Sequence, residues 1–279
     1  MLEDTSNNLD ISDIDFEKIA KLAKNEFGLN LLKGKKALIA SRLSKRLNAK
    51  NISSISEYLE SISTDNDPNE RDHLITALTT NVTSFFREVH HFEYLEQNLS
   101  EMVGKKKRIR LWSAGCSSGQ EPYSMAMTVL CSIKNQTDCD IKILATDIDQ
   151  SILDTAKKGI YSNDTLESIP ENKTKFVQNV RDQDGTFSIC NDAKDLVTFG
   201  QLNLIENWPI HGPFDAIFCR NVTIYFDAET QKKLWTRFCE MLSPGGLLCI
   251  GHSERLSGPA TAGLDNIGVT SYRKIPGKP

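Results

Sequence analysis

Apolar side chains in the first eighty residues recur at the three- and four-residue spacing of a helix. The first such set is Phe16, Ile19, Ala20, Ala23 and Phe27. Gly28 follows it as a helix stop, and similar periodic stretches cover 35–47, 56–62 and 70–78. No strand pattern interrupts these stretches, so the sequence predicts a small helical domain over residues 1–80.

The pattern changes after residue 108 to short apolar runs that end in small or polar residues. These runs are Ile109–Trp112, Ile141–Ala145, Phe214–Cys219 and Leu247–Gly251. Stretches with helical periodicity lie between them, at 123–133, 151–158 and 229–242. Apolar strands that alternate with helices predict a parallel sheet covered by helices on both faces. We therefore expect a second, α/β domain over residues 81–279.

The stretch 175–199 differs from the rest of this second domain. It contains three β-prone runs, at 176–180, 186–189 and 196–199, and an Asp-Gly turn within 182–185 lies between the first two. An Asp-Gly pair between β-prone runs indicates a hairpin. We predict a small antiparallel β insert here.

Composition and charge exclude several classes of protein. With 39% apolar and 25% charged residues the chain is typical of globular proteins, and its net charge of −4 argues against nucleic acid as a partner. The seven cysteines form no Cys-x-x-Cys pair, and no histidines cluster at metal-ligand spacing, so we expect no disulfide framework and no metal site. No apolar run reaches the length of a membrane span, so we expect a cytoplasmic protein without membrane insertion.

A glycine-containing loop, 113–122, follows the first predicted strand and leads into a helix. In a doubly wound sheet, nucleotides bind at this place. Ser117 replaces the glycine that lets a diphosphate approach the backbone, and Glu121 puts a carboxylate at the helix start, where it would repel phosphate. The ligand should therefore lack phosphate and carry positive charge, which disfavours a nicotinamide dehydrogenase.

S-adenosylmethionine meets these requirements, because its methionyl ammonium and its sulfonium are cationic. Its ribose still needs an acceptor, and Asp147 ends the second predicted strand, where an acidic residue takes ribose hydroxyls. The alternatives to a cofactor site are that the loop is only a turn and that Glu121 is only a helix cap.

Several separated motifs carry a resemblance to a known family. They are Asn81-Val-Thr-Ser-Phe-Phe-Arg87, Ser113-Ala-Gly-Cys-Ser-Ser-Gly-Gln-Glu-Pro-Tyr-Ser124, Ala145-Thr-Asp-Ile-Asp149, Phe214-Asp-Ala-Ile-Phe-Cys-Arg-Asn-Val-Thr-Ile-Tyr-Phe226 and Gly251-His-Ser-Glu254. Over nearly its whole length the chain resembles the CheR-type chemotaxis receptor glutamate methyltransferases. The resemblance implies a Rossmann-like class I methyltransferase sheet with an N-terminal helical domain and a small antiparallel β insert.

The resemblance also implies roles for residues of the linking segment, 81–104, and of the loop after the first strand. Asn81, Thr83 and Arg87 would close over S-adenosylmethionine from this segment. Gly115 would lie in the cofactor loop, and Glu121 would meet the methionyl part of the cofactor.

Further along the chain, Asp147 would bind the ribose, and Asn203 with Leu204 would meet the adenine edge. Arg220 and Asn221 would complete the pocket. The catalytic candidates nearest the transferred methyl group would be Arg87 and Tyr225. From the residues alone, Tyr225 could equally be a core tyrosine, whereas Phe85 and Phe86 are better explained as packing residues.

The reaction implied by the family is methyl transfer to glutamate side chains of chemotaxis receptors, with S-adenosylhomocysteine as product and sensory adaptation as outcome. Seven basic residues and no acidic residue occur between Lys33 and Lys50 in this otherwise acidic chain. On a helix, Lys35, Arg42 and Arg46 would lie within about 40° of one another. We predict that this stripe, with Lys45, docks the cytoplasmic helical region of the receptor, although a solvated helix face is the alternative.

Two other functions remain open at this point. The chain could be a methyltransferase that acts on a small molecule or RNA, and the acidic composition disfavours RNA. It could also bind the cofactor without catalysis and regulate signalling by docking to receptors. In some members of the family the β insert grips a receptor C-terminal peptide. The short turn predicted within 182–185 argues against that activity here.

Overall fold

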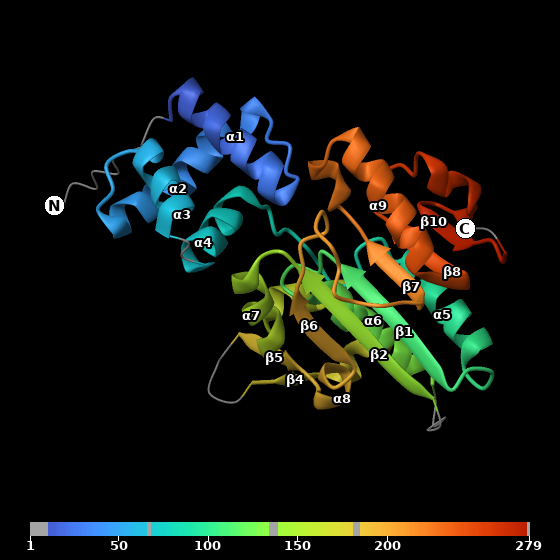
Figure 1. Cartoon of the computed structure of the whole chain (residues 1–279). Coiled ribbons are helices and arrows are strands. Elements are labelled where there is room, and N and C mark those ends of the chain that lie inside the picture. Colours follow the sequence, from blue (N-terminus) through green and yellow to red (C-terminus); the bar gives the residue numbers. More distant parts are fainter. Residues whose placement is uncertain (1–10, 66–67, 134–138, 181–184, 278–279) are drawn as a thin grey trace. The chain divides into compact units, whose positions relative to one another are not determined.

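The computed structural model describes residues 11–65, 68–133, 139–180 and 185–277 (Figure 1). Contacts between residues divide the chain into two compact units. The helical unit comprises Met1–Thr80 with Tyr225–Asp227, and the sheet unit comprises Asn81–Ile224 with Ala228–Pro279. Among the described residues, no helix combines the length and the apolarity that crossing a bilayer requires.

The helical unit consists of helices that the sequence predicts. They are α1 (Asp13–Phe27), α2 (Lys36–Lys50), α3 (Ile55–Asp65) and α4 (Pro68–Leu78), with a short 3-10 turn at Lys33–Lys35 before α2. Ser12 caps α1 by accepting a hydrogen bond from Asp15 N at 3.0 Å, and Gly28 ends it with a left-handed φ of 73°. Ile19, Phe27 and other periodic residues of α1 are buried, which confirms the amphipathic pattern.

The sheet unit is built on a seven-stranded sheet with the order β6-β2-β1-β7-β8-β10-β9. Its strands are β1 (Arg108–Ala114), β2 (Asp140–Asp147), β6 (Val197–Gln201), β7 (Phe214–Cys219), β8 (Leu242–Ile250), β9 (Leu264–Gly268) and β10 (Ser271–Lys274). The first five strands in this order are parallel, whereas β10 and β9 are antiparallel. The parallel part of the sheet is covered on both faces, as the alternation of mainly apolar runs with helical stretches predicts.

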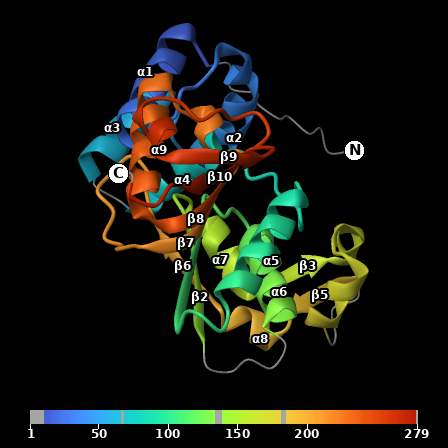
Figure 2. The ribbon, with the colours of Figure 1, turned by 90° about the vertical axis from the view of Figure 1, so that its right-hand side faces the viewer.

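Helices cover both faces of this sheet. They are α5 (His90–Met102), α6 (Gln120–Ser132), α7 (Gln150–Lys158) and α9 (Ala228–Met241). Ile109 and Leu111 of β1 face the core that α5 and α6 share, and these two helices lie side by side in Figure 2. The next residue, Trp112, points to the opposite face and contacts Phe238 of α9 edge-on, with ring centroids 5.3 Å apart.

A separate three-stranded antiparallel sheet forms the β insert, with β5 (Thr186–Ile189) between β3 (Ile160–Ser162) and β4 (Val177–Asn179). A short helix, α8 (Asn191–Lys194), follows β5, and 3-10 turns span Asn163–Ser168 and Glu171–Phe176. The predicted insert, 175–199, was wrong at both ends. Most of the predicted Asp-Gly turn, 182–185, falls on 181–184, outside the described residues.

The third β-prone run of the predicted insert belongs to the main sheet. Residues 197–201 form β6, which pairs parallel with β2 through the partners Ile143 and Val197. A short apolar run is compatible with either sheet, and only the long-range pairing with β2 decides between them. In contrast, β3 joins the insert from outside the predicted range.

The predicted linking segment, 81–104, is only partly a linker. Residues 90–102 form α5, which packs Phe92, Leu95 and Leu99 into the core. Residues 81–89 precede α5 as irregular backbone and turns, and Phe86 N donates to Ser124 Oγ of α6 at 3.0 Å.

Candidate active site

The carboxyl ends of β1, β2 and β7 meet at one edge of the sheet, because these neighbouring strands are parallel. Gly115 follows β1, Asp147 ends β2 and Arg220 follows β7. The strand order reverses between β1 and β7, and such a switch point is where open α/β sheets bind ligands. The structure therefore brings three of the predicted site positions to the expected place.

The loop after β1 leaves space for no side chain at Gly115. The residue has a left-handed φ of 81°, and a Cβ atom there would lie 2.3 Å from Val222 Cγ2. Gly115 N and Cys116 N both donate to Thr146 O, at 2.7 and 2.9 Å. The loop is thus fixed to the end of β2 by its own backbone donors.

Asp147 is a buried carboxylate within this arrangement. Ser117 N donates to its Oδ2 at 2.8 Å, and Asp149 N donates to its Oδ1 at 3.1 Å. Burial raises the pKa of Asp147 to about 6, and the hydrogen bonds from the backbone oppose that rise. Hydroxyl groups of a ligand would supply this carboxylate with further donors.

Glu121 lies buried in the first turn of α6 and is paired with Arg220. Ser113 Oγ donates to Glu121 Oε1 at 2.7 Å, and Arg220 Nη1 donates to Oε2 at 3.1 Å. Burial raises the pKa of Glu121, although the charge of Arg220 opposes this effect. A cation beside Glu121 would stabilise its ionised form in the same way.

Arg220 also holds the turn segment 81–89. Its Nη2 donates to the backbone oxygen of Arg87 and lies 3.6 Å from Glu88 Oε2. At the other end of the segment, Asn81 Nδ2 donates to Asp149 Oδ2 at 3.2 Å, and Ser117 Oγ donates to Asn81 O at 3.0 Å. These contacts bring the backbone of the segment to the loop after β1.

Within this segment the predicted ligand residues differ from the packing residues in burial. Thr83 and Arg87 are half-buried, and Arg87 Nη1 donates to Val82 O at 3.3 Å. Phe85 and Phe86 are buried in the core, which agrees with the packing role expected for them.

The predicted adenine contacts follow β6. Leu202 N donates to Asp147 O at 2.9 Å, so Asn203 and Leu204 emerge beside the end of β2. Asn203 Nδ2 donates to Glu206 Oε1 at 2.8 Å, and Leu204 is buried. Arg237 of α9 donates to Leu204 O at 2.8 Å, and this contact fixes the loop.

Glu254 is a residue at this edge to which sequence reasoning assigned no role, although its motif was recognised. Its carboxylate is buried and accepts a hydrogen bond from Asn221 N at 3.0 Å. The sequence offers one weak signal, an acidic residue three positions after the apolar run Leu247–Gly251, but its burial is visible only in the structure. Asn221 itself has a left-handed φ of 60°.

Tyr225 belongs by its contacts to the helical unit. Asn30 N donates to Tyr225 O at 2.6 Å, and Lys35 Nζ lies 4.5 Å from the centre of the tyrosine ring. The predicted catalytic role of Tyr225, together with Arg87, stays a prediction.

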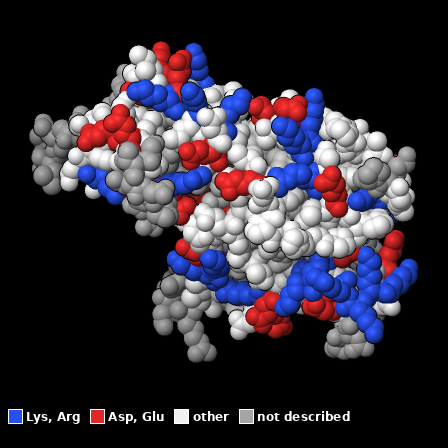
Figure 3. Space-filling model, in the orientation of Figure 1, with Lys and Arg blue, Asp and Glu red and all other residues white. Residues whose placement is uncertain are grey.

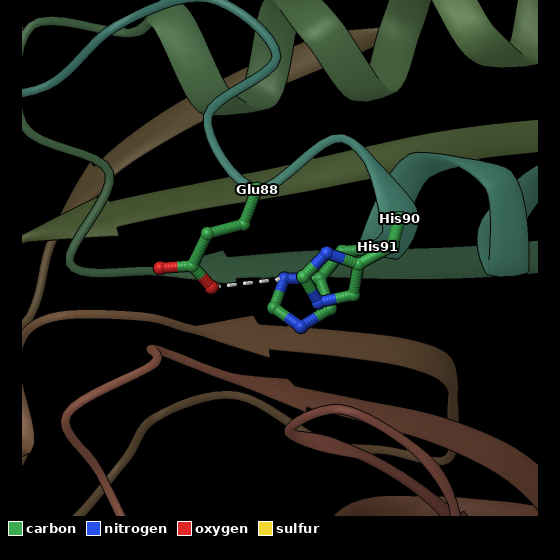
Figure 4. Close-up of side chains that lie close together, drawn as sticks. All are labelled: Glu88, His90 and His91. Carbon is green, nitrogen blue, oxygen red and sulfur yellow. Dashed lines mark ion pairs between the residues drawn. The ribbon is translucent and has the colours of Figure 1, made fainter.

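Glu88, His90 and His91 offer three possible metal-ligand atoms within 4.8 Å of one another (Figure 4). His91 is fully buried, and this burial lowers its pKa to about 3, so its ring is neutral near pH 7. However, Glu88 Oε1 already accepts from His252 Nδ1 at 3.0 Å, and Glu88 faces the guanidinium of Arg220. The charge of Arg220 opposes a cation at this cluster.

The predicted docking stripe is less free than the sequence suggests, and Lys35 lies in the 3-10 turn before α2 rather than on the helix. Arg42 Nη1 donates to Ala77 O at 3.1 Å, and Arg46 forms an ion pair with Glu70. In the helical unit, basic side chains are interspersed with acidic ones on the face that Figure 3 shows. Lys35 is half-buried, and Lys45 is exposed on α2.

Two family models match the chain. The model described as CheR methyltransferase, all-alpha domain, matches residues 14–79, and the model described as CheR methyltransferase, SAM binding domain, matches residues 81–272. SAM denotes S-adenosylmethionine.

Curated relatives match over most of their length. A probable chemotaxis protein methyltransferase of Rhizobium etli is 45% identical over 255 residues, which cover 89% of this chain and 95% of the relative. Chemotaxis protein methyltransferase 2 of Pseudomonas aeruginosa is 40% identical and covers 92% of each chain. The chemotaxis protein methyltransferase of Escherichia coli is 36% identical, over 92% of this chain and 90% of the relative. With its all-alpha and SAM-binding domains, the chain belongs to the CheR family of methyltransferases.

Proposed function

We propose that this chain transfers the methyl group of SAM to glutamate side chains of chemotaxis receptors, the methyl-accepting chemotaxis proteins. The products are glutamate methyl esters and S-adenosylhomocysteine, and the outcome is sensory adaptation. One structural observation carries the cofactor part of the proposal: two buried carboxylates, Glu121 and Asp147, lie at the sheet's switch point. The curated relatives, named as chemotaxis protein methyltransferases, support the receptor as the substrate.

The residues at this edge fit SAM by their chemistry. Glu121 suits the cationic methionyl part, because burial disfavours its charge and a nearby cation compensates for that. Asp147 suits ribose hydroxyls, which donate to a carboxylate. Asn203 and Leu204 would meet the adenine edge. The other residues that we assign to the SAM pocket are Asn81, Thr83, Gly115, Arg220 and Asn221.

The chain needs no general base for this reaction. SAM supplies a methyl group on a positively charged sulfur, and a glutamate of reference pKa about 4.3 is already ionised at neutral pH. The protein therefore has to align the carboxylate, remove water from it and hold it, which together supply several kcal/mol. We assign Arg87 to bind one carboxylate oxygen and Tyr225 to orient the reacting groups.

The receptor's glutamate-rich helical region is the partner that the basic residues of α2 would attract. Arg42 and Arg46 already bond to groups inside the helical unit, so their charge reversal would also disturb the fold. Lys45 is exposed, and Lys45→Glu is therefore the cleaner test. The variant should raise the receptor concentration needed for half-maximal methylation, and Lys21→Glu on exposed α1 surface should not. Methylation should also fall with rising salt.

The defining experiment incubates the full chain with methyl-labelled SAM and receptor-containing membranes. Label released by mild alkali indicates carboxyl methyl esters, since methylated nitrogen resists such treatment. Alkali-stable label, or label in RNA or in small molecules, would assign a different methyltransferase activity. If the chain binds S-adenosylhomocysteine but methylates nothing, the result would favour a non-catalytic regulator.

Variants of the catalytic candidates test the mechanism separately. Arg87→Ala and Tyr225→Phe should each lower turnover about 100-fold, the usual effect of removing one positioned donor. Their affinity for S-adenosylhomocysteine, measured by calorimetry, should change far less. Arg108→Ala, at the exposed start of β1, serves as the control and should keep full turnover. Unchanged turnover in both candidate variants would remove Arg87 and Tyr225 from the mechanism.

A further inference from the structure

Glu254 is almost fully buried, with 3% of its surface exposed, in the turn that follows β8. Glu254 N donates to Gly251 O at 2.9 Å, which closes this turn. A buried carboxylate is costly unless donors surround it. The surroundings of Glu254 therefore indicate what the residue does.

Backbone donors of the loop after β7 converge on the Glu254 carboxylate. Asn221 N donates to Oε2 at 3.0 Å, and Val222 N and Thr223 N donate to Oε1 at 3.0 and 2.7 Å. Thr223 Oγ1 donates to Oε1 at 2.8 Å, and Gly251 N donates to Oε2 at 2.5 Å. Successive backbone N–H groups that converge in this way form an anion-binding nest, and here the chain fills it with its own carboxylate.

The loop held by Glu254 packs closely against both neighbouring loops. A Cβ atom at Gly251 would lie 2.7 Å from Asn221 N, and one at Gly115 would lie 2.3 Å from Val222 Cγ2. Asn221 has a left-handed backbone, which costs energy in any residue other than glycine and needs support from its surroundings. The carboxylate supplies that support.

We infer that Glu254 is a positioning residue for the cofactor site, acting through the loop Asn221–Thr223. The Glu254 carboxylate fixes the backbone of Asn221 and keeps the side chain of Val222 packed against Gly115 in the cofactor loop. This inference rests on the proposed function, because the loop is taken to line the SAM pocket. Only an ionised carboxylate offers acceptors to every donor in the nest. A glutamine would turn an NH2 group toward some of the backbone N–H groups.

Asp215 provides a matched control at the opposite end of β7. It is also a buried carboxylate, and it accepts hydrogen bonds from Arg110 N and Ser243 Oγ, both at 2.9 Å, and from Lys106. It lies at the start of β7, whereas the pocket lies beyond the end of that strand. Asp215→Asn should therefore lower stability without altering the cofactor edge.

The experiment measures two quantities in the full chain carrying Glu254→Gln, Thr223→Val or Asp215→Asn. The first is calorimetric affinity for S-adenosylhomocysteine, which Glu254→Gln should weaken at least about tenfold and Thr223→Val less, as hydrogen bonds to a charged group predict. The second is hydrogen exchange at residues 221–223 without ligand. Exchange there should accelerate in both variants and stay unchanged in Asp215→Asn.

Several outcomes would overturn the inference. Equal loss of affinity in Asp215→Asn and Glu254→Gln would reduce the effect to general destabilisation. Unchanged exchange at 221–223 in Glu254→Gln and Thr223→Val would show that the carboxylate does not hold the loop. If the unaltered chain fails to bind S-adenosylhomocysteine, the proposed function fails, and the exchange measurement still reports separately on Glu254.

Discussion

Replacing Arg220 by methionine would leave two carboxylates without their shared cation. In the structure Arg220 Nη1 bonds Glu121 at 3.1 Å, and Nη2 lies 3.6 Å from Glu88. Methionine keeps much of the side-chain volume, so the main loss is electrostatic. Breaking one partner from a buried ion pair costs about 3–5 kcal/mol, because the remaining charge is buried without compensation. For a domain of this size, that cost lowers the melting temperature by about 6–20 °C.

The loss should depend on pH in a defined direction. Burial already raises the pKa of Glu121, and removal of Arg220 would raise it further. Arg220 also contributes to the lowered pKa of Glu88, so that pKa would rise as well. When an acid binds its proton more tightly in the folded state, stability falls as pH rises through its folded pKa. The deficit of Arg220→Met should therefore be larger at pH 8 than at pH 5.

Thermal unfolding followed by circular dichroism at both pH values checks this expectation. Adding Glu121→Gln to Arg220→Met should restore part of the stability, since a neutral amide buries no charge. Arg237→Met is the control, because Arg237 bonds the carbonyl oxygens of Leu204 and Glu206 rather than a carboxylate. Its deficit should be alike at the two pH values. The reasoning is refuted if the Arg220→Met deficit does not change with pH or if Glu121→Gln fails to relieve it.

Three further predictions follow from individual groups. Affinity for S-adenosylhomocysteine, measured by calorimetry, should fall as pH drops through about 6. Burial raises the pKa of Asp147 to about 6, and the protonated carboxyl loses an acceptor. A similar pH profile in Asp147→Asn would contradict this explanation. Gly115→Ala should destabilise the chain by at least about 1 kcal/mol in urea unfolding, because φ is 81° and Val222 lies in the way, whereas Gly200→Ala, with open space around it, should not. Arg46→Met should destabilise the helical unit near pH 7 relative to the exposed control Lys45→Met, as measured by urea unfolding. The ion pair with Arg46 lowers the pKa of Glu70 to about 2, so the stability that the pair contributes is complete above about pH 4.5 and declines as pH falls toward 2. If the stability deficit of Arg46→Met stays constant at lower pH, the ion pair is not its cause.

Much of the fold follows from local patterns in the sequence. The strands β1, β2 and β7 are short and mainly apolar, with one charged residue inside each, and α1 and α2 carry clear helical periodicity with stop residues. Each is therefore visible within a short window. The helix α5 was missed because most residues of its first two turns are polar and Val89 provides no side-chain cap. The spacing of Phe92, Leu95 and Leu99 was the available signal for this helix.

The candidate site divides in the same way between local and long-range information. Gly115, Asp147 and Arg220 were predictable because each follows or ends an apolar strand, and parallel strands share one carboxyl edge. The contact between Glu254 and Asn221 joins a side chain to a backbone group 33 residues away, and no local pattern encodes it. The ion pairs of Arg46 and Lys50 with Glu70 were missed for the same reason, since Glu70 lies on another helix.

The loop after β1 gives a structural reason why the sheet edge suits a cation better than a diphosphate. In dinucleotide-binding sheets, backbone N–H groups at this turn face the phosphates. Here the N–H groups of Gly115 and Cys116 donate to Thr146 O, and that of Ser117 donates to the Asp147 carboxylate. The helix start is occupied by the buried Glu121. A diphosphate would therefore meet two carboxylates and would have to break the bonds that fix the loop to β2. A cationic ligand would meet the same carboxylates favourably and leave those bonds intact.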